Sequence, residues 1–292
     1  MYGQGGNVHC CCNLGILFMN ERTVFFLSDQ TGVTAETLGH SLITQFDSQK
    51  FPQVTLPFID SDDKAWEAVQ KINESGAEDT HRPIVFSTLV QPEFRKIVKE
   101  AKGLHLDIFD VFLEPLEKEL GQAPAHESGR AHGMSDINAY MKRIEATNFA
   151  LANDDGGSSR NYEVADVILL GVSRSGKTPT CLYLALQYGV YAANYPLTEE
   201  DFEAGKLPGF LRDHSRKIFG LTIAPERLQQ IRKERRPMGS YSSAQQVRYE
   251  LRESEKIFKK YGIPFVDTTE FSIEEISSRI LDSTGVERRV RP

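Results

Sequence analysis

The sequence Gly171-Val-Ser-Arg-Ser-Gly-Lys-Thr178 follows directly on an apolar run, Val164-Ala-Asp-Val-Ile-Leu-Leu170. The run predicts a buried strand, and residues 180–188, which end at Gly189, predict a helix. A GxxxxGK[ST] loop between a strand and a helix is typical of phosphate binding, because its glycines let successive N–H groups and the helix N-terminus face an anion. The alternative is a glycine turn with a chance lysine. The predicted nucleotide-binding residues are Gly171, Val172, Ser173, Arg174, Ser175, Gly176, Lys177 and Thr178.

An alternation of strands and helices extends outward on both sides of this loop. The predicted strands are residues 23–27, 54–59, 83–86 and 106–112 in the first half, and 164–170, 190–194, 217–223 and 262–267 in the second. This alternation predicts an α/β fold with mostly parallel sheets, flanking helices on both faces, and the P-loop in the C-terminal half. The order of the strands does not follow from the sequence.

Three helices carry specific expectations. In residues 34–46, Thr34 is expected to cap the helix. The residues expected on one face of that helix, with a spacing of four, are Leu38, Leu42 and Phe46. Residues 242–261 predict a long amphipathic helix with an apolar inner face. Ser272-Ile-Glu-Glu275 predicts a capping box at the start of the last helix.

The predicted elements divide the chain into four segments. Residues 1–19 read unlike the rest, and we interpret them as an extension or disordered tail before a natural start at Met19. Residues 20–120 predict an N-terminal α/β domain, and residues 161–292 predict a P-loop nucleotide-binding domain. Residues 121–160 begin with loop composition and form the predicted linker region.

Histidines and cysteines raise the question of a metal site. His126 and His132 lie in the predicted linker, where solvated loop histidines are the alternative to a metal or phosphate ligand pair. Cys10–Cys12 have no second pair of ligands at the spacing of a metal cluster. Because Cys181 has no obvious partner either, we expect no disulfide framework, and a cytoplasmic, reducing environment fits the pattern.

Composition and charge exclude several classes of protein. The 292 residues are 40% hydrophobic and 26% charged, as in an ordinary globular protein. The net charge of −7 argues against a nucleic-acid binder, which needs a basic face. We expect the basic cluster Arg232, Lys233, Arg235 and Arg236 to meet phosphate or an acidic protein surface. No apolar run reaches the length of about 18 residues that a membrane-spanning helix needs. Whether the chain forms a homodimer is left open.

Lys177 and Thr178 give the loop its expected chemistry. Lys177 is predicted to neutralise the terminal phosphates of a nucleotide, and Thr178 Oγ to bind Mg²⁺. Asp154 and Asp155 lie shortly before the strand that leads into the loop, where they are candidates to hold Mg²⁺ or to accept a hydroxyl proton. The alternative for this pair is a polar turn. Asp267, at the end of the last predicted strand, is another candidate for Mg²⁺.

Ser28-Asp-Gln-Thr-Gly-Val-Thr34 is a second candidate anion site. It also lies where a predicted strand ends and a helix begins. Ligands of open α/β sheets bind at the carboxyl ends of the strands, and the hydroxyl and N–H groups of a helix start suit an anion. The alternative is a capped helix without a ligand.

Several long stretches make the chain resemble a known family, the phosphoenolpyruvate synthase regulatory proteins, which are kin to the pyruvate, phosphate dikinase regulatory proteins. The stretches are Phe26–His40, Ala152–Gly156, Ile168–Thr180, Ala193–Leu197 and Phe219–Ile223. The resemblance covers residues 20–290. The chain departs from the family pattern at Gln30, where a small residue is usual, and at Asn153, where a histidine is usual.

The resemblance implies a bifunctional enzyme. Such proteins phosphorylate a threonine of the target enzyme with ADP as the donor, which releases AMP and inactivates the target. They also remove that phosphate with inorganic phosphate as the acceptor, which releases pyrophosphate. The family's nucleotide-binding stretch maps onto Gly171–Thr178. One cradle for either the β-phosphate of ADP or free phosphate suits both directions.

Three alternatives stay open at this point. The target of the same two activities is either phosphoenolpyruvate synthase or pyruvate, phosphate dikinase. A P-loop small-molecule kinase would use ATP and need no protein partner. A nucleotide-sensing module would bind adenylates without catalysis. Release of AMP in the presence of a target protein distinguishes the enzyme from the sensor.

Overall fold

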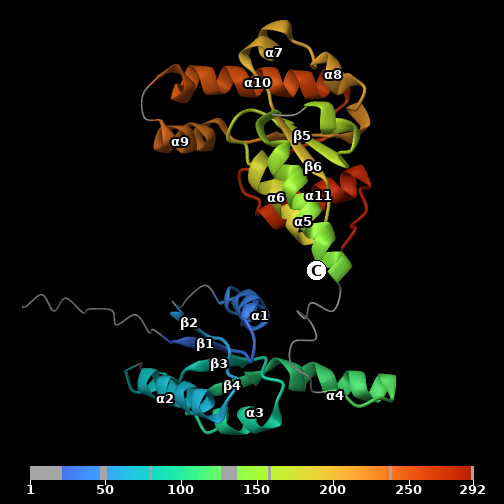
Figure 1. Ribbon diagram of the computed structural model, residues 1–292. Coiled ribbons are helices and arrows are strands. Elements are labelled where there is room, and N and C mark those ends of the chain that lie inside the picture. The colour runs from blue at the N-terminus through green and yellow to red at the C-terminus, as the bar shows by residue number, and fades with distance from the viewer. Residues whose placement is uncertain are drawn as a thin grey trace, which may run out of the picture. The chain divides into compact units, whose positions relative to one another are not determined.

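The computed structural model describes residues 22–46, 51–78, 81–125, 137–156, 159–236 and 239–290 (Figure 1). The chain divides into two compact units, residues 1–133 and 134–292, and each is described by itself. The predictions for residues 1–19, Cys10–Cys12, Met19, His126 and His132 lie outside the described residues.

The first unit contains a four-stranded parallel sheet in the order β2-β1-β3-β4. Its strands are β1 (Val24–Leu27), β2 (Gln53–Leu56), β3 (Ile84–Ser87) and β4 (Leu104–Asp107). Its helices are α1 (Val33–Ile43), α2 (Asp62–Glu78), α3 (Pro92–Val98) and α4 (Ile108–Leu120). The strands are parallel and alternate with helices, as the sequence predicts.

The second unit repeats this strand order, as β6-β5-β7-β8, in another parallel sheet. Its strands are β5 (Val167–Gly171), β6 (Ala192–Pro196), β7 (Ile218–Thr222) and β8 (Phe265–Asp267). Its α-helices are α5 (Ile137–Ala152), α6 (Lys177–Tyr188), α7 (Glu199–Ala204), α8 (Gly209–Arg212), α9 (Pro225–Arg235), α10 (Ala244–Tyr261) and α11 (Ile273–Thr284). Its 3-10 turns are η1 (Asp154–Gly156), η2 (Ser159–Glu163), η3 (Ser215–Lys217) and η4 (Ser240–Ser242). The predicted α/β class with parallel sheets and flanking helices is confirmed.

Strand β5 is buried along its whole length and contributes residues to both hydrophobic clusters of the second unit. Because side chains alternate across a strand, Ile168 and Leu170 pack with residues of α9 and α10 on one face. Val167 and Leu169 pack with residues of α5, α6 and α11 on the other. This double burial fixes the carboxyl end of β5, from which the glycine loop starts.

The predicted fourth strand, residues 106–112, is only partly right. Strand β4 ends at Asp107, and the residues from Ile108 onward form α4. The Asp107 side chain accepts hydrogen bonds from the backbone N–H groups of Phe109 and Asp110, so it caps this helix. The apolar, β-prone composition after Asp107 concealed the helix start.

The predicted linker over residues 121–160 includes a helix that belongs to the second unit. Helix α5 occupies Ile137–Ala152, and its residues Ala146 and Ala150 are buried in the core with residues of α6. The inner face of α5 is thus made of small side chains. Large apolar residues at helical spacing are the signal that reveals a packed helix, and this face lacks them.

Helix α1 buries a different face from the one that its large apolar residues indicate. The buried residues are Ala35, Gly39 and Ile43. Of the predicted face, Leu38 is half-buried against this core, as expected, but Leu42 and Phe46 are 47% and 63% exposed. A Cβ atom added to Gly39 would lie 2.3 Å from a ring carbon of Phe26, so the helix lies directly on the aromatic side chains of the sheet. Shape, and not side-chain hydrophobicity, decides which face of α1 is buried.

Two other helix predictions are confirmed. The buried residues of α10 are Val247, Leu251, Ser254, Ile257 and Phe258, which form the expected inner face. Ser272 and Glu275 form the capping box of α11. In the part of the chain that the structure describes, no helix has the length and apolar character to cross a membrane.

Candidate active site

Residues 171–178, the glycine loop, connect β5 to α6 with a tightly folded backbone. Gly171 has no room for a side chain, because an added Cβ would lie 2.4 Å from the carbonyl oxygen of Leu221 on β7. Arg174 and Gly176 have φ angles of 74° and 91°. Gly176 is the N-cap of α6. The loop therefore turns sharply into the N-terminus of the helix, where a phosphate loop needs to end.

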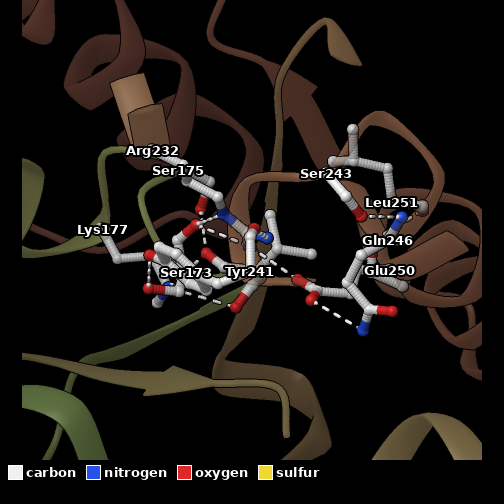
Figure 2. Close-up of polar contacts among 12 residues, drawn as sticks. Ser173, Ser175, Lys177, Arg232, Tyr241, Ser243, Gln246, Glu250 and Leu251 are labelled. Carbon is white, nitrogen blue, oxygen red and sulfur yellow. Dashed lines mark hydrogen bonds and ion pairs between the residues drawn. The ribbon is translucent and has the colours of Figure 1, made fainter. Parts of the chain in front are cut away.

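Side chains hold the carbonyl oxygens at the start of the glycine loop. Lys177 Nζ donates to the carbonyl oxygens of Gly171 at 3.1 Å and Val172 at 2.8 Å. Arg232, from α9, donates to the carbonyl oxygen of Ser173 at 3.1 Å through Nη2 (Figure 2). These carbonyl dipoles are thus directed toward protein cations.

Five amide groups of the glycine loop are unpaired within the part of the chain that the structure describes. The N–H groups of Ser173, Arg174, Gly176, Lys177 and Thr178 have no hydrogen-bond acceptor among the described residues. The first N–H groups of a helix lack an acceptor within the helix, and here the preceding loop adds further donors. A run of unpaired N–H groups at a helix N-terminus favours an anion. The geometry of the loop suits a phosphate group.

Lys177 is buried, with 5% of its surface exposed. Burial lowers the pKa of its ammonium group to about 8, against the opposing effect of the nearby Asp155 carboxylate. A shift of this size corresponds to a cost of about 3 kcal/mol for keeping the lysine charged at neutral pH. A bound phosphate would offset that cost, because its negative charge stabilises the ammonium group.

Asp154 and Thr178 lie together beside the loop. Asp154 Oδ1 accepts a hydrogen bond from Thr178 Oγ1 at 2.8 Å and another from Asn194 Nδ2. Asn194, on β6, is 1% exposed, and its Nδ2 also lies 3.2 Å from Thr178 Oγ1. The structure thus joins two residues that the sequence singled out separately, and a buried amide holds them in place.

Asp155 has a different environment from Asp154. Its backbone N–H donates to Asn194 Oδ1 at 2.9 Å, and its φ of 53° is unusual for a residue with a side chain. The side chain of Asp155 is exposed, whereas that of Asp154 is half-buried. Asn153, where the resembled family has a histidine, is fully buried, and its carbonyl oxygen accepts from the N–H of Asn194 at 3.2 Å. Asn194 therefore fixes the whole acidic turn.

The predicted Mg²⁺ ligand Thr178 lies next to a carboxylate that suits the same ion. Hydroxyl and carboxylate oxygens are ligands that Mg²⁺ accepts, usually together with water and phosphate oxygens. Thr178 and Asp154 fit that donor set. Asp267, the other candidate, uses its Oδ1 to accept from the N–H of Thr269 at 2.9 Å, within the turn after β8.

The second candidate anion site, Ser28–Thr34, lies at the carboxyl end of β1 in the first unit. Thr34 is not the cap of α1: the N-cap position is Gly32, with φ 83°, and no described side chain caps the helix there. Ser28 Oγ accepts from the N–H of Gln30 at 3.1 Å. Anion binding by this segment stays a prediction.

The basic cluster of α9 is not one surface patch. Arg232 is fully buried and pairs with Glu250 at 2.6 Å, whereas Lys233, Arg235 and Arg236 are exposed. Adjacent residues of a helix point in different directions, so a basic run in the sequence need not form a patch. The expectation that Arg232 meets phosphate or an acidic partner surface is wrong.

Four residues support the site through contacts that the sequence does not predict. They are Asn194, Arg232, Tyr241 and Thr268. Tyr241 OH lies 3.0 Å from Ser173 Oγ, and Thr268 Oγ1 donates to the carbonyl oxygen of Ser175 at 3.3 Å. A usable signal exists only for Asn194, a polar residue within a predicted apolar strand. The others come from distant segments that only the folded chain brings to the loop.

A comparison with known families matches residues 24–281 to the family model described as kinase/pyrophosphorylase. The chain belongs to this family. The match includes both sheets and the whole glycine loop. The geometry of that loop is therefore that of a kinase/pyrophosphorylase family member.

Curated relatives cover nearly the whole chain. A protein of Marinobacter nauticus is 52% identical over 92% of this chain and 99% of its own length. One of Alcanivorax borkumensis is 53% identical over 93% of this chain and all of its own length. One of Herminiimonas arsenicoxydans is 54% identical over 92% of this chain and 96% of its own length. Each bears the name "Putative phosphoenolpyruvate synthase regulatory protein". The resemblance that the sequence motifs carry is confirmed.

Phosphate binding should weaken as pH rises through the pKa of Lys177. The pKa of about 8 in the free protein rises when an anion binds, so binding takes up a proton. Affinity for inorganic phosphate, measured by calorimetry, is expected to fall about tenfold per pH unit above about pH 8. The variant Lys177→Met should bind weakly with no such dependence. Wild-type affinity that stays constant from about pH 7 to about pH 9.5 would contradict this role for Lys177.

Proposed function

We propose that this protein is a bifunctional regulator of phosphoenolpyruvate synthase. It transfers the β-phosphate of ADP to a threonine of the synthase, which inactivates that enzyme and releases AMP. It also removes the phosphate with inorganic phosphate as acceptor, which restores the synthase and releases pyrophosphate. The observation that carries the proposal is the glycine loop of a kinase/pyrophosphorylase family member. This loop has a buried lysine and five N–H groups without an acceptor among the described residues.

Two features support this proposal over a general phosphate site. The relatives' shared name supplies the target, phosphoenolpyruvate synthase. The family description pairs a kinase with a pyrophosphorylase, which fits transfer in both directions through one phosphate cradle. A single cradle also avoids placing two dense anions side by side, which would repel each other.

In the kinase direction, the threonine hydroxyl oxygen attacks the β-phosphorus of ADP. A new oxygen–phosphorus bond forms as the bond to the bridging oxygen breaks, AMP leaves with that oxygen, and the hydroxyl proton passes to a base. Lys177 and the loop N–H groups neutralise charge on the transferred phosphoryl group. In the reverse direction a phosphate oxygen attacks the phosphothreonine phosphorus, and the threonine oxygen regains a proton as pyrophosphate forms.

We assign different roles to the two aspartates. Asp154 already accepts hydrogen bonds from Thr178 and Asn194, so its role is to hold Thr178 in the first turn of α6. Asp155 has an exposed side chain beside the same loop, and it is available to accept the proton of an incoming hydroxyl. Asn194 binds both residues, because its Oδ1 accepts from the Asp155 backbone N–H and its Nδ2 donates to the Asp154 side chain.

Mg²⁺ is the proposed cofactor, and Thr178 with Asp154 would hold it. When bound, the ion would supply positive charge to the phosphate oxygens. ADP and inorganic phosphate are the proposed small-molecule substrates, and both would use the glycine loop.

Three other functions remain as outcomes of the same experiment. Action on pyruvate, phosphate dikinase would give the same products with a different target. A small-molecule kinase would consume ATP without labelling a protein. A nucleotide sensor would bind ADP and release no AMP.

The donor should be ADP and the acceptor a threonine of the synthase. Purified protein would be incubated with phosphoenolpyruvate synthase and either β-labelled ADP or γ-labelled ATP. We expect label on a synthase threonine from ADP, with one AMP released per phosphate transferred, and no transfer by Lys177→Met. Label from ATP and not from ADP would contradict the proposal, and dikinase in place of the synthase tests the alternative target.

The variants Asp155→Asn and Asp154→Asn should separate the two aspartates. Loss of a general base lowers kcat by about 10²- to 10⁴-fold, so Asp155→Asn should lower kcat and leave the KM for ADP nearly unchanged. Asp154→Asn should raise the Mg²⁺ concentration needed for half-maximal rate. Steady-state rates of AMP release at several ADP and Mg²⁺ concentrations measure both effects. The reverse pattern would exchange the two roles.

A further inference from the structure

Ser173, in the glycine loop, is held at two points by residues that the proposed reaction does not use (Figure 2). Its carbonyl oxygen accepts from Arg232 Nη2 at 3.1 Å and Nε at 3.4 Å. Its hydroxyl lies 3.0 Å from the hydroxyl of Tyr241. Arg232 is itself fixed, because it donates to the carbonyl oxygen of Tyr241 at 3.0 Å and to Glu250 at 2.6 Å. We name Arg232, Tyr241 and Glu250 the arginine clamp.

Arg232, at the centre of the arginine clamp, is not accessible to a ligand of its own. Arg232 is 0% exposed, and its guanidinium carbon lies 4.3 Å from the centre of the Tyr241 ring. Its four recorded hydrogen bonds go to three protein groups on α10, η4 and the glycine loop. Such a cation acts through the group that it holds, which here is the carbonyl oxygen of Ser173.

The direction of that carbonyl determines the direction of the next N–H group. In a trans peptide the C=O of one residue and the N–H of the following residue point in opposite directions. Because Arg232 holds the Ser173 oxygen, the N–H of Arg174 points away from the arginine clamp. That N–H has no acceptor among the described residues, so it is available to a ligand.

This peptide orientation is unfavourable for Arg174 without support. A φ of 74° places Arg174 in the left-handed region, which residues with a Cβ atom avoid. Rotation of the Ser173–Arg174 peptide would relieve the strain and turn the N–H away from the cradle. The hydrogen bonds from Arg232 to Ser173 oppose that rotation.

We propose that Arg232 is a positioning residue for phosphate binding, which keeps the Ser173–Arg174 peptide turned so that the Arg174 N–H faces the phosphate. The inference rests on the proposed function, in which the glycine loop binds the phosphates of ADP and free phosphate. Glu250 and the carbonyl oxygen of Tyr241 orient the guanidinium group of Arg232 by accepting its hydrogen bonds.

The first test is the affinity of the full chain for inorganic phosphate and for ADP, measured by calorimetry. Arg232→Met should weaken both by about tenfold or more, because one hydrogen bond to a charged ligand is lost. The matched control is Arg248→Met. Arg248 of α10 pairs with Glu226 of α9 at 3.3 Å, so it joins the same two helices, but both its side chain and that of Glu226 are exposed. The control should bind like wild type.

The decisive test repeats the comparison in an Arg174→Gly background. Glycine adopts a positive φ without strain, so the loop no longer needs the clamp to hold that residue. The loss caused by Arg232→Met should then shrink to about threefold or less. General damage to the fold would give the same loss in both backgrounds.

Each outcome of these measurements decides the inference. Equal losses in the two backgrounds, or wild-type affinity in Arg232→Met, would overturn it. If Arg232→Met does not fold, Arg232→Lys provides the same comparison, because lysine keeps the charge beside Glu250 but lacks the forked donors. If the wild-type protein binds neither phosphate nor ADP, the proposed function fails and this inference fails with it.

Discussion

A loop that binds phosphate through its backbone must direct its N–H groups toward the ligand and its carbonyl oxygens away from it. In this protein the carbonyl oxygens at the start of the glycine loop accept from Lys177 and Arg232, two buried cations. The rest of the second unit supports this arrangement. Strand β5 is buried on both faces and fixes the start of the loop, α6 fixes its end, and α9 with α10 places Arg232 behind it.

The buried charges around the glycine loop favour the binding of an anion. Burial disfavours the charged form of Lys177, and Arg232 adds a second positive charge. The Asp155 and Asp154 carboxylates offset this only in part, since the pKa of Lys177 remains low. A phosphate group would supply the missing negative charge and hydrogen-bond acceptors together. The same account is consistent with the proposed function, in which one site serves ADP in one direction and inorganic phosphate in the other.

The sequence predicted the fold class and the central loop because both depend on local patterns. A buried strand, a glycine loop and a helix are adjacent in the chain, and each has its own signal. Where a helix buries small residues, the pattern of large apolar residues that would predict its packed face is absent. Helix α5 buries alanines, and α1 buries Gly39 against Phe26 while Leu42 remains exposed. In these elements the shape of the neighbouring surface decides the packing.

The candidate site was predictable only in its contiguous part. Lys177, Thr178 and Asp154 were singled out because they lie in or near the loop in sequence, although the hydrogen bond between Thr178 and Asp154 was not foreseen. In the sequence, Arg232 is one of a run of cations expected at the surface, but in the structure it is buried beneath the loop. Its partners, Glu250 and the Ser173 carbonyl oxygen, come together with it only in the folded chain, so the sequence gives no sign of them. Residues that orient a loop from a distant helix leave no motif in a single sequence.

The backbone amide signals of the glycine loop provide the most direct test of the central claim, that these N–H groups form a phosphate cradle. Inorganic phosphate would be titrated into the full, isotope-labelled chain, and the amide resonances followed by NMR. The account predicts large, saturable shifts confined mainly to the N–H groups of Ser173, Arg174, Gly176, Lys177 and Thr178. It would be contradicted if these signals stayed in place, or if the saturable shifts appeared instead in Ser28–Thr34.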